Sequence, residues 1–169
     1  MSDTKIIIAL SNPKSPTNVG AVMRAAGCFC VDSVLYTGER YDRAVKLNTD
    51  TKKISATVPL TGVKNLLDHR IDGLKVVCVD LIEGALPLPL FDHPEKALYI
   101  FGPEDGTIDQ SVIDQADAVV YIPTIGCMNL AATVNVVLYD RLAKSTTHAT
   151  DNLLIRQSRD TNNKVKVRR

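Results

Sequence analysis

Four short apolar runs, separated by segments with helix signals, constrain the fold of this chain more than any other feature. Each run is almost continuously apolar, whereas a strand with one face in solvent alternates apolar and polar residues. The runs therefore predict strands of a parallel sheet that is covered on both faces. They occupy Lys5–Leu10, Lys75–Val79, Ala97–Gly102 and Ala118–Pro123, and Ser33–Tyr36 is a weaker fifth candidate.

Helix signals lie between these predicted strands. We expect helices over Asn18–Cys28, with Thr17 or Asn18 as the N-cap, and over Val63–His69, Asp109–Ala116 and Cys127–Lys144. The segment 38–53 is polar and is expected to be a surface excursion. Strands that alternate with helices predict an α/β domain with a mostly parallel sheet flanked by helices.

The predicted helix Cys127–Lys144 is apolar around most of its circumference, so more than one of its sides must be buried. A second copy of the chain is the expected cover for the side that the sheet leaves open. The apolar side chains belong to Met128, Leu130, Ala131, Val134, Val136, Val137, Leu138 and Leu142.

The length of 169 residues and the 45% content of hydrophobic residues predict one domain, over residues 1–150. The remaining segment, residues 151–169, contains six Lys or Arg and two Asp, so this basic tail carries +4 while the whole chain carries +1. No apolar run approaches the roughly 20 residues of a membrane span, and the N-terminus lacks a signal-peptide layout. A cytoplasmic protein without a membrane partner is expected.

The cysteines and histidines predict neither a metal site nor a disulfide framework. Cys28, Cys30, Cys78 and Cys127 lack paired C-x-x-C spacing, and three of the four lie in apolar stretches where a thiol packs as a small hydrophobe. The three histidines, His69, His93 and His148, lie in polar segments without Cys or Asp at triad or metal spacing, so we expect them on the surface.

Common nucleotide sites are excluded by the residues after the first strand. The chain contains neither G-x-x-x-x-G-K-[ST] nor a G-x-G-x-x-G after that strand, which instead enters the stiff segment S-N-P-K-S-P, residues 11–16.

Three motifs in a fixed order remain. The first is N-P-K-S-P-T-N-V-G-A-V-M-R-A-A at residues 12–26, the second is I-F-G-P-E-D-G at residues 100–106, and the third is Y-I-P-T-I-G-C-M-N-L at residues 121–130. Together they resemble the motifs of the SpoU (TrmH-like) branch of the SPOUT methyltransferases, over most of the chain from Ile6 to Arg141. Members of this family transfer a methyl group from S-adenosyl-L-methionine to a ribose 2′-hydroxyl of tRNA or rRNA.

The resemblance implies a fold with a C-terminal deep trefoil knot, a homodimer, structured RNA as the partner, and no metal. It assigns catalytic roles to Arg24, Asn18, Glu104 and Asn129. Arg24 would stabilise the developing alkoxide and position the phosphate. The cofactor would be bound by Asp80, Leu81, Gly102, Pro103, Ile122, Cys127, Met128 and Leu130.

The same residues can also be interpreted as purely structural. Arg24 could be a helix arginine at the edge of the core, Glu104 an acidic residue near a helix start, and Asn129 an N-cap. Cys127 replaces the family's serine, Gly106 comes one position early, and the third-motif loop is about three residues short. The short loop and the replaced serine favour, as an alternative, a knotted RNA-binding module that has lost methyl transfer. An ordinary α/β enzyme for small molecules is a third possibility that explains neither Arg24 with Asn18 nor the basic tail.

Overall fold

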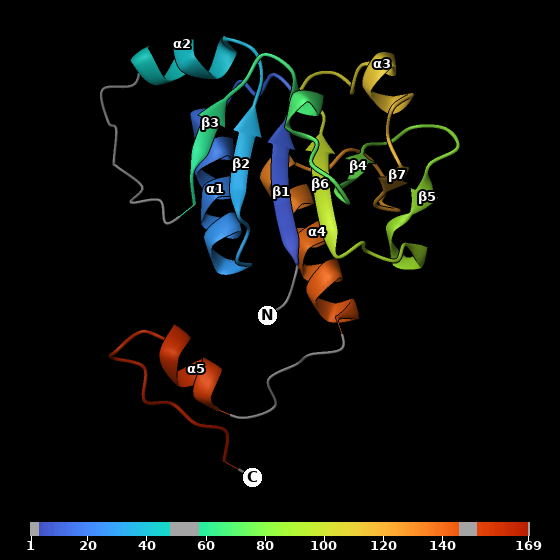
Figure 1. Cartoon of the computed structure of the whole chain (residues 1–169). Helices are drawn as coiled ribbons and strands as arrows, with labels where there is room; N and C mark the ends of the chain where they lie inside the picture. Colours follow the sequence, from blue (N-terminus) through green and yellow to red (C-terminus); the bar gives the residue numbers. More distant parts are fainter. Residues whose placement is uncertain (1–3, 48–57, 146–151, 169) are drawn as a thin grey trace.

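The computed structural model describes residues 4–47, 58–145 and 152–168. Seven strands form one sheet (Figure 1): β1 (Lys5–Leu10), β2 (Ser33–Tyr36), β3 (Leu60–Gly62), β4 (Lys75–Val79), β5 (Leu86–Pro87), β6 (Lys96–Phe101) and β7 (Ala118–Tyr121). The helices are α1 (Pro16–Cys28), α2 (Arg40–Leu47), α3 (Gln110–Ile113), α4 (Leu130–Lys144) and α5 (Leu153–Ser158), with 3₁₀ turns η1 (Leu66–His69) and η2 (Leu88–Leu90).

The order of strands in the sheet is β3-β2-β1-β6-β4-β7-β5, and every neighbouring pair is parallel. The predicted parallel α/β sheet is therefore confirmed, and all five predicted strands are present. Strands β3 and β5 were not predicted because two or three residues are too few to give a periodic signal.

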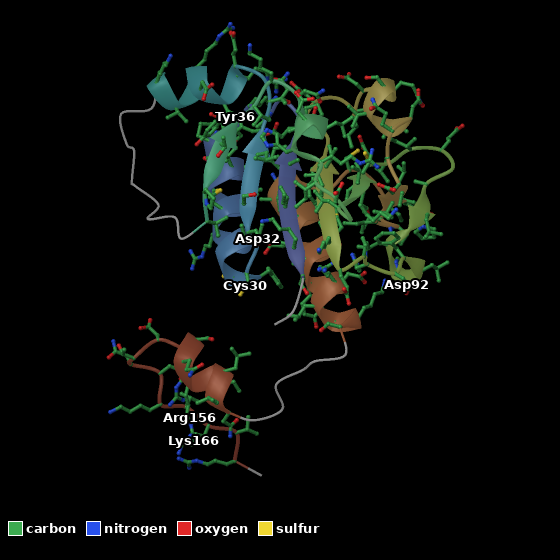
Figure 2. All side chains as sticks on the ribbon, viewed as in Figure 1. Cys30, Asp32, Tyr36, Asp92, Arg156 and Lys166 are labelled. Carbon is green, nitrogen blue, oxygen red and sulfur yellow. The ribbon has the colours of Figure 1, made fainter. Side chains whose placement is uncertain are left out.

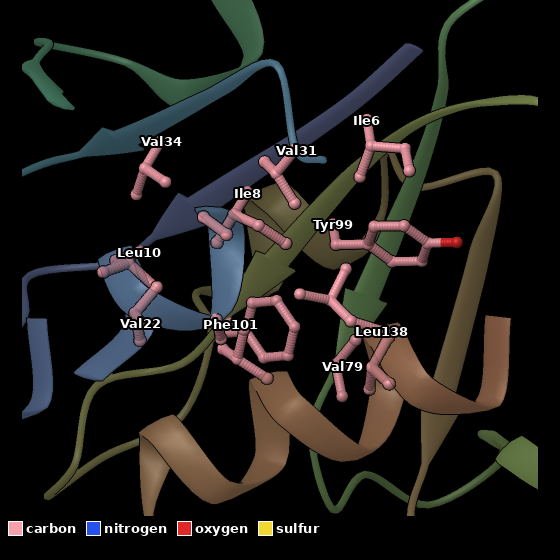
Figure 3. Close-up of a cluster of buried hydrophobic side chains, with 14 of the residues drawn as sticks. Ile6, Ile8, Leu10, Val22, Val31, Val34, Val79, Tyr99, Phe101 and Leu138 are labelled. Atoms are coloured by element: carbon pink, nitrogen blue, oxygen red, sulfur yellow. The ribbon is translucent and has the colours of Figure 1, made fainter. Parts of the chain in front are cut away.

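Both faces of the sheet are covered, as the continuous apolar runs predicted. On one face, Ile6, Ile8 and Leu10 of β1 pack with Tyr99 and Phe101 of β6 against α1 and α4 (Figure 3). On the other face, the alternate strand residues pack against η1, α3 and their flanking loops, and this second cluster includes Ile7, Ala9, Val76, Cys78, Leu98 and Ile100. Alternate residues of a strand point to opposite faces, so one apolar run supplies both clusters.

The first helix begins earlier than predicted. Its N-cap is Ser15, whose side chain accepts a hydrogen bond from the backbone N–H of Asn18, and not Thr17 or Asn18. Pro16 occupies the first turn, where a missing N–H costs nothing. The earlier start frees the side chain of Asn18 for other contacts.

Three other helix predictions need correction. The segment 63–69 forms only the 3₁₀ turn η1, capped by Asn65, and α3 is shorter than Asp109–Ala116 because it ends at Ile113. The polar segment 38–53, expected to be a surface excursion, contains the helix α2, and none of residues 38–46 is buried; residues 48–53 lie outside the described residues. Helix α4 begins at Leu130 and not at Cys127, because Asn129 is its N-cap.

Helix α4 has one buried side and one exposed apolar side. Leu130, Ala131, Val134, Val137 and Leu138 are buried against the sheet and α1. The exposed fractions of Val136, Tyr139 and Leu142 are 36%, 64% and 47%. These three residues lie three apart along the helix and form one exposed apolar stripe; Val136 and Leu142 belong to the apolar set expected from the sequence, and Tyr139 does not.

The prediction that all histidines lie on the surface is wrong for His93, whose side chain is only 4% exposed. Its Nδ1 lies 2.6 Å from the hydroxyl of Tyr99 and its Nε2 lies 2.8 Å from Oδ2 of Asp140. Arg141 also donates to the Tyr99 hydroxyl, and Lys144 pairs with Asp140. This set of five residues, the lower network, joins the C-terminal half of α4 to the residues that precede β6 and to β6 itself.

The cysteine prediction holds only for Cys78, which is buried, whereas Cys28, Cys30 and Cys127 are exposed. Cys28 is the last residue of α1. Cys30 lies where the chain turns towards Asp32 and β2, at the end of β2 opposite Tyr36 (Figure 2). His69 is exposed as predicted, and His148 lies outside the described residues.

In the tail, Arg156, Lys166 and their neighbours are exposed (Figure 2), and α5 is its only helix among the described residues. No helix in the described part of the chain is both long and apolar enough to cross a membrane.

Candidate active site

A pocket opens at the carboxyl ends of β4, β6 and β7, which is the edge of a parallel sheet where α/β proteins bind ligands. It is formed by residues that follow these three strands and by the start of α4. All eight residues that were predicted to bind the cofactor line it: Asp80, Leu81, Gly102, Pro103, Ile122, Cys127, Met128 and Leu130.

The side chain of Asp80 joins the strand ends that form the pocket. Its Oδ1 accepts from the backbone N–H of Leu81 at 2.8 Å, and its Oδ2 accepts from the N–H of Ile108 at 3.1 Å. A Cβ atom on Gly102 would lie 2.8 Å from that same Oδ2. Glycine at position 102 leaves room for the Asp80 carboxylate, which a side chain at that position would displace.

The four predicted catalytic residues divide into three that meet and one that does not. The side-chain amide of Asn129 donates to Oδ1 of Asn18 at 3.0 Å, and the amide of Asn18 donates to Oε1 of Glu104 at 3.1 Å. Motif residues separated by as many as 111 positions are therefore linked in one chain of hydrogen bonds, here termed the upper network.

The orientation of both amides in the upper network is fixed by their other partners. Oδ1 of Asn129 accepts from the backbone N–H groups of Ala131 and Ala132, which can only donate, so its NH₂ group must face Asn18. Asn129 is thus an N-cap, as the structural reading held, and a member of the upper network as well.

Glu104 is held as a carboxylate by neutral donors. Partial burial acts to raise the pKa of Glu104, but hydrogen bonds from Asn18 and from the backbone N–H groups of Glu104, Lys14 and Ser15 outweigh it and hold the pKa below its ordinary value. The side chain of Lys14 does not contribute, since its Nζ pairs with Asp105, which also binds Arg40. Glu104 therefore fixes the loop before α1 against the loop after β6.

Arg24 lies apart from this group. It is exposed, it does not line the pocket of its own chain, and it has no hydrogen bond or ion pair to any described residue. It follows Asn18 by six residues on α1, which is about 9 Å along a helix axis. Among the described residues, no carboxylate pairs with Arg24, whereas its position between the buried residues Met23 and Ala25 is compatible with an arginine at the edge of the core.

The short third-motif loop is ordered by its own hydrogen bonds. The hydroxyl of Thr124 donates to the carbonyl of Gly126 at 3.1 Å, and Gly126 has φ +86°, a conformation that favours glycine. Ile125 between them is fully exposed. The shortened loop thus still places Thr124 and Cys127 on the pocket wall.

Sequence reasoning missed several pocket residues: Val79, Phe101, Gly106, Thr124 and Thr133. The signal that could have placed Thr133 in the pocket is its position four residues after Asn129, on the same face of the predicted helix. Within the described residues, no three His, Cys, Asp or Glu side chains gather as a group that could hold a metal ion.

Comparison with known proteins gives the family. Residues 5–139 match the sequence model of the SpoU rRNA Methylase family. The chain is 26% identical over 151 residues to the 23S rRNA (guanosine-2′-O-)-methyltransferase RlmB of Acinetobacter baylyi, a match that covers 82% of this chain and 60% of the relative. The RlmB of Nitrosomonas europaea is also 26% identical, over 83% of this chain and 56% of its own length. The chain therefore spans somewhat more than half of these curated relatives.

Solved structures share the fold. The SpoU methyltransferase AviRb of Streptomyces viridochromogenes, in complex with AdoMet, matches 85% of this chain and 59% of its own with a TM-score of 0.68 at 19% identity. The TrmH/SpoU tRNA modifying enzyme of A. aeolicus matches 84% and 76% with a TM-score of 0.65 at 18% identity. With the family model covering most of its length, this chain belongs to the SpoU rRNA methylase family.

Proposed function

We propose that this protein is a methyltransferase that uses S-adenosyl-L-methionine to methylate a ribose 2′-hydroxyl of tRNA or rRNA. The observation that carries the proposal is the upper network. Asn18, Glu104 and Asn129 come from three distant motifs, and their side chains meet at one end of the sheet beside the pocket. The relative RlmB is named as a 23S rRNA (guanosine-2′-O-)-methyltransferase, and the similar A. aeolicus structure is described as a tRNA modifying enzyme.

The pocket lining fits the cofactor. Leu81, Ile122 and Leu130 provide apolar surface for a purine ring, while Thr124, Thr133 and the exposed backbone edges of the loops can bind hydroxyl and ammonium groups. When bound, S-adenosyl-L-methionine supplies an already activated methyl group. The tasks of the protein are then to orient the ribose, to accept the hydroxyl proton and to stabilise the oxygen as charge develops on it.

Arg24 takes its role from a second subunit in this proposal. It is exposed on α1 and absent from its own pocket, and the exposed apolar stripe of α4 (Val136, Tyr139 and Leu142) needs a cover. Helices α1 and α4 pack against each other. A two-fold dimer through these helices would bury the stripe and carry Arg24 into the partner's pocket, where its guanidinium would hold a phosphate and stabilise the alkoxide.

The strand order supports the proposed trefoil knot. The connection from β4 to β6 runs out to β5 and returns through η2, and β7 pairs with both β4 and β5. The later strand β7 therefore lies between β4, where this connection begins, and β5, which is part of it. After β7, the chain returns as α4 and Lys144 donates to the carbonyls of Leu88 and Phe91 in that same connection.

The basic tail is proposed to bind RNA through its phosphates. All of its described basic residues except the half-buried Arg159 are exposed, and phosphate contacts by Lys and Arg add affinity without reading sequence. Deleting residues 151–169 should weaken RNA binding and reduce the slope of affinity against salt concentration. Equal affinity and equal slope for the full-length and truncated proteins would exclude the tail from binding.

Two measurements test the methyltransferase proposal. Calorimetric titration with S-adenosyl-L-methionine should show binding, and a radiolabelled methyl assay on total tRNA and rRNA should show transfer. Binding of cofactor and RNA without transfer would favour the alternative, an RNA-binding module that has lost activity. No binding of the cofactor would refute the methyltransferase.

A mixed dimer tests the shared site. An Arg24→Ala chain and a Gly102→Trp chain are each expected to be inactive, the second because a large side chain displaces Asp80 in the pocket. Mixed, they should recover activity at one site per heterodimer, because one pocket then has both an intact wall and an intact arginine. If mass spectrometry verifies the heterodimers and activity is still not recovered, Arg24 acts in the active site of its own subunit.

A further inference from the structure

The pocket wall carries two negative charges and, within the described residues, no positive side chain. Asp80 and Glu104 are its only ionisable carboxylates, and the remaining lining residues are apolar, hydroxyl, thiol, proline or glycine residues. The nearby cations Lys14 and Arg40 are both paired with Asp105, which is not part of the lining.

Neither carboxylate of the wall is neutralised by an ion pair. Asp80 accepts hydrogen bonds from two backbone N–H groups, and Glu104 accepts from the Asn18 amide and from the backbone N–H groups of Lys14, Ser15 and Glu104 itself. These donors are dipoles without net charge, so they fix both carboxylates in place and leave their charge available to a ligand. Asp80 is the more available of the two, because Glu104 already serves the upper network.

We propose that Asp80 is a specificity determinant that selects the cationic methyl donor over its neutral product. This inference rests on the proposed function. S-adenosyl-L-methionine carries one net positive charge because of its sulfonium, whereas S-adenosylhomocysteine, the thioether left after transfer, is neutral overall. A fixed carboxylate in the wall favours the first over the second by the same Coulomb interaction that shifts the pKa of a neighbouring cation. After transfer the sulfonium charge is lost, so S-adenosylhomocysteine is bound more weakly and is released.

The test compares the affinities of three ligands by calorimetry without turnover. The third ligand, sinefungin, is unreactive and has a protonated amine where the cofactor has its sulfonium. At low ionic strength, the wild-type protein should bind both cationic ligands about tenfold more tightly than S-adenosylhomocysteine, which corresponds to about one pKa unit of interaction. Raised salt should reduce that ratio, because the pocket is open to solvent.

Asp80→Asn removes the charge and keeps one acceptor oxygen, while its NH₂ group faces the second backbone N–H. All three ligands share any loss of affinity that comes from the altered wall, so the ratio of cationic to neutral affinity is the measured quantity, and it should fall to within about threefold. Asp105→Asn is the matched control, since it removes a carboxylate outside the lining, and its ratio should stay close to that of the wild type.

Three results separate this inference from the proposed function. Binding of all three ligands to the wild-type protein with equal affinity would overturn the inference and leave the proposed function standing. An equal loss of ratio in Asp80→Asn and Asp105→Asn would also overturn it, because the effect would then come from overall charge. Binding of none of the three ligands would refute the proposed function itself. The wild-type comparison does not depend on the folding of any variant.

Discussion

Helix α4 begins in one polar network and ends in another, and the two differ in how completely their partners are supplied by the protein. In the upper network, Asn18, Glu104 and Asn129 are only partly buried or exposed and lie beside an open pocket. In the lower network, His93 is almost fully enclosed and is bonded on both ring nitrogens. A network open to solvent can accept a ligand, whereas an enclosed and satisfied network can only hold the fold together.

The donors and acceptors of the lower network are fully matched. The Asp140 carboxylate can only accept, so Nε2–H of His93 donates to it. Nδ1 of the neutral ring then accepts from the Tyr99 hydroxyl, which itself accepts from Arg141. The hydroxyl of Tyr99 projects from the apolar cluster in Figure 3. No buried side-chain nitrogen or oxygen among the described residues lacks a partner. Substitutions at the two ends of α4 should therefore change different properties.

The largest effect is expected from Arg24→Ala, at the upper end. Because Arg24 is exposed and unpaired among the described residues, its removal should change the free energy of unfolding by no more than about 0.5 kcal/mol. Its proposed role in the transition state predicts a loss of methyl transfer of about 10³-fold with unchanged cofactor affinity. Arg43→Ala, an exposed arginine on α2, is the control. Retention of more than about a tenth of the rate would remove Arg24 from the mechanism.

Asn18→Ala should have the next largest effect on methyl transfer. It cuts the link between Glu104 and Asn129, and a loss of rate of about 10²-fold is expected from a misplaced catalytic group. Glu104 would keep the backbone donors of Lys14 and Ser15, and water can replace the amide, so stability should fall by about 1 kcal/mol or less. Rate and thermal unfolding are measured on the same preparation. A loss of stability that accounts for the whole loss of rate would make Asn18 a structural residue like Tyr99.

The two networks also show what could be predicted from the sequence. Neither is visible in local spacing, because their partners are separated by 86 positions for Asn18 and Glu104 and by 47 for His93 and Asp140. The upper network was found because its residues belong to ordered motifs that resemble a family. The lower network belongs to no motif, and a histidine in a polar segment looks like a surface residue until β6 and α4 bring Tyr99 and Asp140 to it.

The sheet was predictable for a different reason. Continuous apolar runs report burial on two faces, so five strands and their parallel arrangement followed from the residues alone. Caps and short elements could not be predicted in this way. The choice of Ser15 over Thr17 or Asn18 as the N-cap depends on one side-chain hydrogen bond, and β5 has only two residues. The roles of the site residues, the dimer, the knot and the cytoplasmic location remain predictions.

Tyr99→Phe tests the lower end of α4 with a single atom. The ring stays buried, but Nδ1 of His93 loses its donor and Arg141 loses an acceptor. Unfolding in denaturant should show a loss of about 1–3 kcal/mol, the cost of leaving buried groups unsatisfied. Methyl transfer per folded molecule should equal that of the wild type. A variant with wild-type stability and reduced activity would reverse the assignment of the two networks.

The smallest expected effect is a dependence of stability on pH that comes from His93. Burial lowers the pKa of His93, and Arg141 and Lys144 act in the same direction, while the hydrogen bond and charge of Asp140 oppose them without outweighing the burial. Tyr99 and Asp140 are the titratable groups bonded to the ring.

Protonation is thus less favourable in the folded protein than in the unfolded chain, where histidine titrates near about 6.5. As pH falls below that value, the unfolded chain binds a proton that the folded protein does not, so the free energy of unfolding decreases, by at most about 1.4 kcal/mol per pH unit. His93→Gln keeps one donor and one acceptor without titrating, so its stability should vary less than that of the wild type between about pH 6.5 and 5.5. The carboxylates with lowered pKa, such as Glu104 and Asp117, affect stability only in more acidic solution. If the free energy of unfolding of both proteins varies identically with pH in that interval, protonation of His93 costs the folded protein nothing. The lower network would then accommodate a charged imidazole.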